Sequence, residues 1–335
     1  MLDLVTRNLK EIITLEELKE IMKKEERKAY IGFEPSGLVH LGWLMCADKI
    51  KDLISSGFKV KILLADWHAW INDKLDGDMS AIKTCGEYIK DAFTAMDVKN
   101  VEYVYASEMV CNSDYWNMVL KIAKQTSLAR ARRAMNIMGR KAEEAEKDIS
   151  KFFYPLMQVA DIFYLNVDVA LGGMDQRHAH MLARDICTKL KMKKPVALHT
   201  PIISSLQAKE RMDAKMSKSK PESAIFIHDN YEAIKRKLRK AYCPEGIAEG
   251  NPVMEMTKHI IFIHFDEMEI ERKYGGNIKF SSYEELEEKY IKKEVHPLDL
   301  KNSVANYIDK ILLPVRKYFE DNPKNLEKLI SYMNK

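Results

Sequence analysis

Short apolar runs alternate with amphipathic stretches in the first third of the chain, and this alternation most restricts its fold. The expected strands and helices alternate in the order Ala29–Phe33, 41–54, Val60–Ala65, 80–96 and Val101–Tyr105. A further strand at 164–171 should stop at Gly172 and Gly173, before a helix from about residue 175. Strands joined through helices form parallel sheets. We therefore expect an α/β fold with a doubly wound parallel sheet of the Rossmann type.

The remaining segments indicate two domains. Residues 3–28 have an amphipathic helical pattern, with Thr14 as a cap three residues before Glu17. A helical insertion is expected at about 110–150 and a polar loop at 209–222, and the patterns after it are mainly helical. A length of 335 residues also favours two domains. We place them at 1–222 and 223–335.

Composition excludes several classes of protein. The five cysteines are scattered without a C-x-x-C pair, which favours reduced thiols in a cytoplasmic protein and argues against a zinc site. The chain begins without the apolar core of a signal peptide, and no stretch approaches the ~20 apolar residues of a membrane span. A net charge of +4 does not imply a non-specific coat of nucleic acid. We expect no bound metal, no membrane and no DNA partner.

One expected helix, from Phe152 to Leu165, is apolar on nearly every side yet carries polar residues on one face. Tyr154, Gln158 and Asp161 follow each other at i, i+4 and i+7. Burying such groups without partners would cost about 2–7 kcal/mol each. They are therefore expected to line a polar cavity, although buried backbone partners would also explain them.

Further polar residues follow the ends of the predicted strands. They are Glu34, Ser36, His40, Asp66, His68 and Glu108. Ligands of doubly wound sheets bind beyond the carboxyl ends of the strands. The cavity and these residues are therefore expected to form one site.

Two motifs suit the binding of a polyphosphate. His40-Leu41-Gly42-Trp43 opens a helix after a strand and a turn, where free N–H groups and a small glycine favour phosphate. Lys215-Met216-Ser217-Lys218-Ser219 lies in the polar loop and offers two ammonium groups beside hydroxyls. Either motif alone is weak, because a core helix or a solvated loop would explain it.

Together, in this order, the motifs resemble the HIGH and KMSKS signatures of class I aminoacyl-tRNA synthetases. The stretches AYIGFEPSG, LLADWHAW, YPLMQVADI and GGMDQR are similar to tyrosyl-tRNA synthetases of the archaeal and eukaryotic cytoplasmic type. The resemblance covers essentially the whole chain. It implies activation of L-tyrosine with ATP and transfer of the tyrosyl group to tRNA(Tyr).

The resemblance also implies roles for individual residues in the tyrosine pocket. Tyr30 and Asp161 would hold the phenol, and Leu63, Ala65 and His68 would wall the ring. The ammonium would meet three residues at matching positions: Tyr154, Gln158 and Gln176.

The ATP site follows in the same way. His40, Gly42, Lys215, Lys218 and Ser219 would act on the phosphates. The resemblance further assigns Glu34, Ser36, Gly173 and Asp175 to ATP. Trp43 replaces the last histidine of the HIGH motif, and one expectation is that it stacks on adenine. Mg²⁺ should accompany ATP, with no zinc and no organic cofactor.

Contacts with tRNA and with a second subunit are implied as well. The acceptor end matches Arg133, Arg177 and His178, and the anticodon matches Tyr274, His296 and Asp299. The relatives are homodimers that meet through the helical insertion, where the apolar string from Tyr115 to Ile122 suits either an interface or a core.

Three alternatives stay open. A tryptophanyl enzyme shares the fold and both signatures, but an indole has no phenol for Tyr30 and Asp161. A catalytically silent RNA-binding paralogue would tolerate Trp43, but it would not need the retained motifs. A small nucleotidyltransferase would not need the helical C-terminal region.

Overall fold

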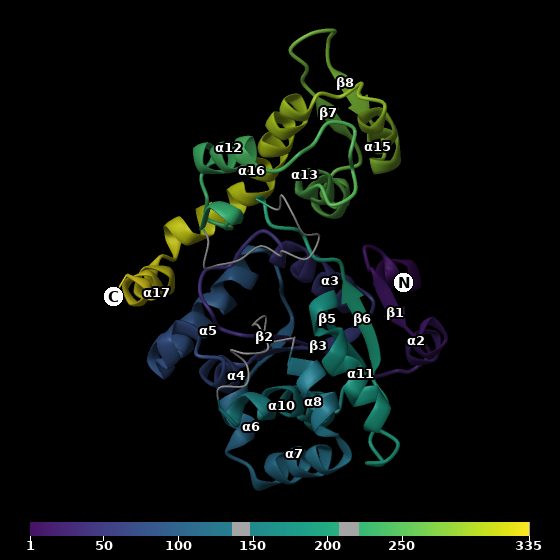
Figure 1. Ribbon diagram of the computed structural model, residues 1–335, viewed down its shortest axis with the longest axis vertical. Coiled ribbons are helices and arrows are strands. Elements are labelled where there is room, and N and C mark those ends of the chain that lie inside the picture. The colour runs from purple at the N-terminus through teal and green to yellow at the C-terminus, as the bar shows by residue number, and fades with distance from the viewer. Residues whose placement is uncertain (136–147, 208–220, 335) are drawn as a thin grey trace.

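A computed structural model describes residues 1–135, 148–207 and 221–334. Figure 1 shows a larger body around a sheet, with a group of mainly helical elements above it that carries the later part of the chain. Most of the predicted loop at 209–222, including Lys215, Lys218 and Ser219, lies outside the described residues. Part of the predicted helical insertion, 136–147, does as well.

The main sheet has six strands in the order β1-β6-β5-β2-β3-β4. Their bounds are β1 Glu11–Ile13, β2 Arg27–Phe33, β3 Phe58–Leu64, β4 Val101–Tyr105, β5 Val169–Gly173 and β6 Val196–Thr200. Strands β2 to β6 pair in parallel, which confirms the predicted fold class. The edge strand β1 pairs antiparallel with β6, so the sheet is mixed.

The predicted helix at 3–28 is wrong in its middle. The chain forms α1 Leu2–Thr6, then β1, then α2 Leu15–Met22. Consecutive β-branched residues at 12–14 favour an extended backbone, and pairing with β6 provides partners for the backbone hydrogen-bonding groups of this segment. The predicted cap is confirmed, because Thr14 and Glu17 form a reciprocal capping box.

The strand predicted at 164–171 begins later than expected. Helix α10, Ser150–Tyr164, is followed by a turn at Asn166 with φ of 49°, and β5 then includes both glycines. An apolar run alone does not separate the end of a buried helix from the start of a buried strand. A 3₁₀ turn, η3 Met174–Gln176, precedes α11 Arg177–Ile186.

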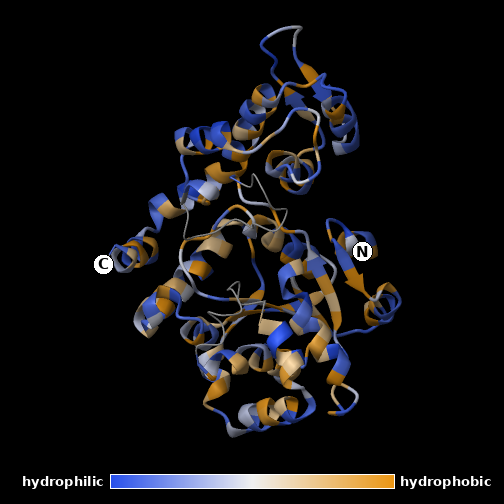
Figure 2. Cartoon of the chain, in the orientation of Figure 1, coloured by the Kyte–Doolittle hydropathy of each residue, from blue (hydrophilic) through white to orange (hydrophobic). Residues whose placement is uncertain are grey.

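Helices cover both faces of the sheet, as alternation of side chains along β2 shows. Ile31 and Phe33 join one hydrophobic cluster with residues of α3 Trp43–Ser55 and α5 Met79–Ala95. Tyr30 joins a second cluster with residues of α10 and α11. Figure 2 shows β6 as hydrophobic along most of its length.

Five further elements lie between β3 and α10 in the described part of the chain. They are α4 Asp66–Ile71, η1 Lys74–Gly77, α6 Ala106–Val110, α7 Ser113–Gln125 and α8 Leu128–Ala134.

The later part of the chain is mainly helical, as predicted, with one small antiparallel pair of strands. Its elements are η4 Pro221–Ser223, α12 Tyr231–Lys240, α13 Pro252–Met256, the π-helical η5 Thr257–Ile261, α14 Phe262–His264, β7 Met268–Ile270, β8 Ile278–Phe280, α15 Tyr283–Ile291, α16 Pro297–Asp321 and α17 Lys324–Met333. Among the described residues, none of the helices has the length and apolar character needed to cross a membrane.

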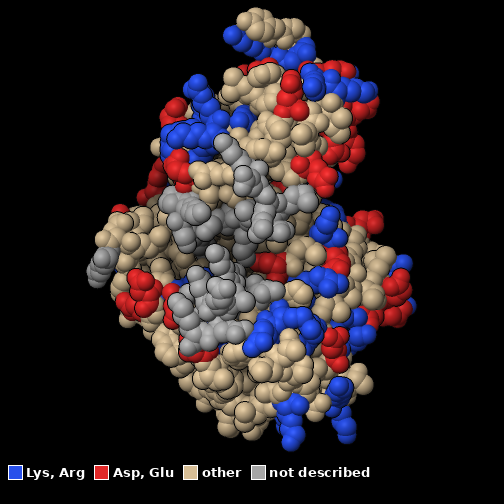
Figure 3. All heavy atoms as spheres, viewed as in Figure 1, with Lys and Arg blue, Asp and Glu red and all other residues tan. Residues whose placement is uncertain are grey.

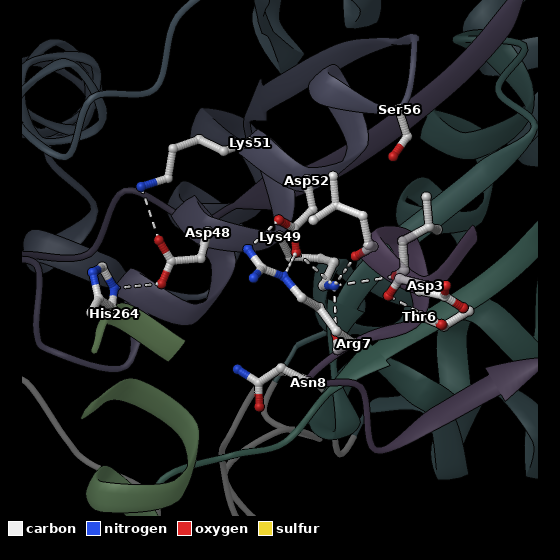
Figure 4. A network of polar contacts seen from close by, with 12 residues as sticks. Asp3, Thr6, Arg7, Asn8, Asp48, Lys49, Lys51, Asp52, Ser56 and His264 are labelled. Carbon is white, nitrogen blue, oxygen red and sulfur yellow. Dashed lines mark hydrogen bonds and ion pairs between the residues drawn. The ribbon is translucent and has the colours of Figure 1, made fainter. Parts of the chain in front are cut away.

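A polar network joins α3 to the N-terminal segment and to His264 of the C-terminal region (Figure 4). Asp52 accepts from Arg7 at 2.6 Å and from the buried Lys49 at 2.9 Å. Asp48 lies 2.9 Å from His264 of the C-terminal region. The helix that begins directly after Gly42 is therefore held by contacts that are distant in sequence.

Candidate active site

The strand order reverses between β2 and β5, where Tyr30 lies beside Ala170. The chain leaves β2 toward Glu34 and leaves β5 toward Asp175. Such a switch point opens a crevice at the carboxyl ends of the strands. Tyr30 of β2 and Asp175 after β5, both predicted to bind a substrate, lie on the two segments that diverge here.

Asp161 is a deeply buried acid of the site, with 1% of its surface exposed. Its Oδ1 accepts a hydrogen bond from the Tyr115 hydroxyl at 2.7 Å, and its Oδ2 lies 3.1 Å from His68 Nε2. Burial lowers the pKa of His68, but the charge and hydrogen bond of Asp161, together with the charges of Glu34 and Asp66, outweigh burial and leave the pKa raised. The partners of Asp161 are therefore side chains, whereas the alternative interpretation of this helix face expected buried backbone groups.

Tyr115 was not predicted for this site. The sequence shows it only as one member of an apolar string, and its ring is fully buried as that string suggests. Nothing in the pattern of α7 indicates that its hydroxyl reaches Asp161. The inward-facing residues of this string therefore belong to the hydrophobic core, and one of them, Tyr115, also bonds a polar group.

Tyr30 stands in the same hydrophobic cluster as Leu63, Ala65 and Tyr154. Burial, and next the negative charge of Asp161, raise the pKa of the Tyr30 phenol. Tyr30 and Asp161 are therefore brought into electrostatic reach of each other, as expected for a shared phenol partner.

Several buried polar atoms of this cavity have no hydrogen-bond partner. Gln158 Nε2 donates to Gln176 Oε1 at 3.0 Å, while Gln158 Oε1 has none. Both ring nitrogens of His68 also lack a well-directed bond, despite the short distance to Asp161. Buried groups of this kind are normally satisfied, so they point to a polar ligand.

Glu34 contacts several polar side chains near Tyr154. Its Oε1 accepts from Asn72 Nδ2 at 2.8 Å and from the Tyr154 hydroxyl at 3.3 Å. Lys74 Nζ lies 3.6 Å from Oε2. Ser36 Oγ donates to the Glu34 carbonyl at 3.0 Å. No sequence pattern indicated Asn72, a fully buried amide at the end of α4.

Gly42 is required by the position of His40. The His40 ring folds back so that Nδ1 accepts from the Gly42 N–H at 3.2 Å. A Cβ at residue 42 would lie 3.0 Å from His40 Cε1. The predicted motif therefore forms a compact unit at the start of α3.

Trp43 does not extend from this unit into the site. Its ring stacks on Phe33 with centroids 4.3 Å apart, lies near Phe93, and is 9% exposed. The position of the indole in the core argues against the expected stacking on adenine. Apolar packing explains Trp43 in this chain without a ligand.

Gly173 and Asp175 form a similar unit after β5. A Cβ at residue 173 would lie 2.6 Å from Asp175 Oδ1, so only glycine leaves this carboxylate its place. The arrangement places a carboxylate at the switch point.

The segment after the KMSKS-like loop is paired with the HIGH-like motif. Leu41 N–H donates to the Ile225 carbonyl at 2.7 Å, and Ile227 N–H donates to the Val39 carbonyl at 3.1 Å. His40 and Phe226 form an antiparallel bridge. The end of the loop is thus anchored beside His40, although residues 208–220 are not described.

The comparison with protein families agrees with this geometry. The family described as tRNA synthetases class I (W and Y) matches residues 22–313. This chain belongs to that family.

Similar members of this synthetase family are known from archaea. A tyrosine–tRNA ligase of Saccharolobus islandicus is 49% identical over 100% of this chain and 97% of its own length. The tyrosyl-tRNA synthetase structure from Aeropyrum pernix has a TM-score of 0.91 and 46% identity, covering 100% of this chain and 98% of the other. The enzyme from Pyrococcus horikoshii, complexed with L-tyrosine, has a TM-score of 0.93 and 41% identity, covering 98% of both chains.

In this synthetase the residues predicted for the tRNA acceptor end lie near one another. Burial, and then the charges of Arg130, Arg177 and Arg133, lower the pKa of His178. Arg177 Nε donates to both carboxylate oxygens of Glu11, at 3.0 and 2.9 Å. The three predicted residues therefore share one basic surface.

The residues predicted for the anticodon lie in the C-terminal region. Tyr274 is in the loop between β7 and β8 and is 77% exposed. His296 caps α16 by accepting from the Leu298 N–H, and Asp299 stands in the first turn. Strand β7 packs on α16, because Glu269 N–H donates to the Tyr307 hydroxyl at 2.9 Å.

Proposed function

We propose that this chain is a tyrosine–tRNA ligase. It would join L-tyrosine and ATP into tyrosyl-adenylate and pyrophosphate, and then transfer the tyrosyl group to tRNA(Tyr). The observation that carries the proposal is the buried polar face of α10. It holds Asp161 and Gln158, whose Oε1 has no hydrogen-bond partner, among buried apolar side chains.

The cavity suits each part of tyrosine. The phenol hydroxyl would bond Tyr30 and Asp161, while Leu63, Ala65 and His68 would surround the ring. The ammonium would donate to Gln158 Oε1, next to Gln176 and the Tyr154 hydroxyl. A tryptophan indole would leave the phenol partners unpaired, so tyrosine is the substrate that the site favours.

The reaction then needs position and charge stabilisation rather than an enzyme nucleophile. The tyrosine carboxylate attacks the α-phosphorus of ATP in line, and pyrophosphate leaves. His40 and the N–H groups at Gly42 would stabilise charge on the phosphates, and Asp175 beside Gly173 would hold the ribose. Glu34 and Ser36 would stand at the junction of the two substrates.

The remaining parts of the ATP site are inferred from sequence. Lys215, Lys218 and Ser219 would close over the pyrophosphate. Mg²⁺ would arrive with ATP and be held mainly by phosphate oxygens and water. We place the reaction in the cytoplasm, with domains at 1–222 and 223–335.

The tRNA would bind at both ends of the molecule. Arg133, Arg177 and His178 would contact the acceptor end, while the exposed ring of Tyr274 would stack on an anticodon base beside His296 and Asp299. Lysine and arginine side chains also gather over α12 (Figure 3).

A homodimer is also proposed. Large apolar side chains are exposed on α7 and α8, at Trp116, Leu120 and Leu128. Surfaces of this kind mark protein contacts when they are grouped. Sedimentation should give twice the mass of the 38.9 kDa chain, and a monomer would refute this part.

The direct test of the whole function is charging of tRNA(Tyr). With ATP present, the chain should attach labelled tyrosine to tRNA(Tyr), and omission of ATP should abolish the product. Adenylate formation without transfer would limit the proposal to its first step.

A further inference from the structure

Lys74 is a cation beside the substrate cavity that takes no part in the reaction described above. Its Nζ lies 3.6 Å from Glu34 Oε2, and 28% of its side chain is exposed. The other oxygen of Glu34 accepts from Asn72 and from the Tyr154 hydroxyl. Lys74 therefore neutralises the carboxylate next to the hydroxyl at which the tyrosine ammonium is proposed to bind.

The turn that carries Lys74 has an unusual backbone. Asp73, Leu75 and Asp76 have φ values of 49°, 50° and 57°, in the left-handed region that side chains other than glycine rarely adopt. Such a conformation persists only when surrounding contacts hold it. A specific anchor is therefore expected at this turn.

Lys151 supplies that anchor. It is 2% exposed, and its Nζ donates to the Ile71 carbonyl and, at 2.6 Å, to Asp73 Oδ2. Lys151 lies three residues before Tyr154 and seven before Gln158 on α10. Helix α10, which carries the proposed partners of the ammonium, thus also fixes the backbone of the turn. The Lys74 side chain can still change its conformation, because its four-carbon stem is flexible.

An ammonium bound beside the Tyr154 hydroxyl would bring a second positive charge close to Glu34, because that hydroxyl lies 3.3 Å from Glu34 Oε1, so it would compete with Lys74 for the charge of this carboxylate. Like charges a few ångströms apart repel strongly in a partly buried site. An empty site without Lys74, however, would leave a partly buried carboxylate without a cation. We propose that Lys74 is a resident counter-ion of Glu34 that the α-ammonium of the amino acid displaces on binding. This inference rests on the proposed function.

The test is calorimetric binding without ATP, using the full chain, K74M and K74R. Lys74→Met removes the competing charge and should lower the Kd for L-tyrosine about 3- to 10-fold. Lys74→Arg keeps the charge and should bind tyrosine like the unmodified chain. The analogue 3-(4-hydroxyphenyl)propanoate has no ammonium, so it should gain nothing from K74M.

The outcomes separate this inference from the proposed function. Equal or weaker tyrosine binding by K74M, or an equal gain for the analogue, would overturn the role of Lys74 while leaving the tyrosine site intact. Failure of the unmodified chain to bind tyrosine would overturn both. Unchanged melting temperatures of the variants would show that binding was compared between folded proteins.

Discussion

At the scale of single residues, the site depends on polar groups that are buried in apolar surroundings. Asp161 is held by Tyr115 and His68, and it acts on the charge state of both the His68 ring and the Tyr30 phenol. A carboxylate so placed is costly unless its partners are complete. We propose that recognition of the tyrosine hydroxyl offsets this cost.

Asp161→Ala should reduce the preference for tyrosine over phenylalanine. Loss of a bond between a hydroxyl and a charged group is worth about 1.5–3 kcal/mol, so the preference should fall about 10- to 100-fold. The ratio of kcat/KM for the two amino acids in pyrophosphate exchange measures this. Asp161→Asn keeps the volume and an acceptor oxygen, and it should lose less. An unchanged ratio in the alanine variant would remove Asp161 from the phenol site.

The sequence could predict the polar face of α10 because its spacing shows in an apolar helix. It could not predict Tyr115 or Asn72, since each looks like an ordinary member of its helix. Their roles depend on which partner the tertiary fold brings near, and short-range patterns carry no record of that. Trp43 is the reverse case, because its motif position suggested a ligand contact while its ring packs on Phe33 in the core.

At the scale of elements, the proposed functions depend on the start of helix α3 and on the loop between β7 and β8. Strands β2, β3 and β4 were predictable from apolar runs between turn residues, whereas β1 was not. Three residues at a sheet edge carry too little periodicity, and β1 forms only because β6 offers it a partner.

Gly42→Ala should impair the phosphate site at the start of α3. The new Cβ would lie 3.0 Å from the His40 ring, so the ring must move. We expect pyrophosphate exchange to fall at least about 10-fold, as loss of one transition-state contact does, with the Kd for tyrosine unchanged. Rapid exchange by the variant would show that the position of His40 is not important. Tyrosine binding serves as the control for folding.

Tyr274→Ala should raise the KM for tRNA while sparing adenylate formation. Stacking on one base contributes about 1–3 kcal/mol, which corresponds to roughly a 5- to 100-fold change. Tyr274→Phe keeps the ring and should behave like the unmodified chain. If charging of tRNA is unaffected by the alanine variant, the stacking role is wrong.

At the scale of the whole molecule, long-range ion pairs join elements that are distant in sequence. Glu17 of α2 contacts Arg184 at 2.7 Å and Lys194 at 2.8 Å, near the edge of the sheet. Burial would raise the pKa of Glu17, but hydrogen bonds and charge from Lys194 and Arg184 lower it to about 2. The sequence could not predict these pairs, because charged residues of many surfaces look alike.

This shift predicts a loss of stability in acid. A pKa that folding lowers from 4.5 adds stability above pH 4.5, and that contribution disappears as the pH falls toward 2. Glu17→Gln keeps the capping box but not the charge. The difference in free energy of unfolding between the two proteins should therefore shrink from pH 6 to pH 3 in urea titrations. A constant difference over this range would contradict the assignment.

The most direct test of the account is amino-acid-dependent exchange between ATP and pyrophosphate, measured with tyrosine, tryptophan and phenylalanine in parallel. The geometry of Asp161, Gln158 and the His40 motif predicts exchange with tyrosine and little with the other two. Exchange that is strongest with tryptophan, or none with any of the three, would contradict it.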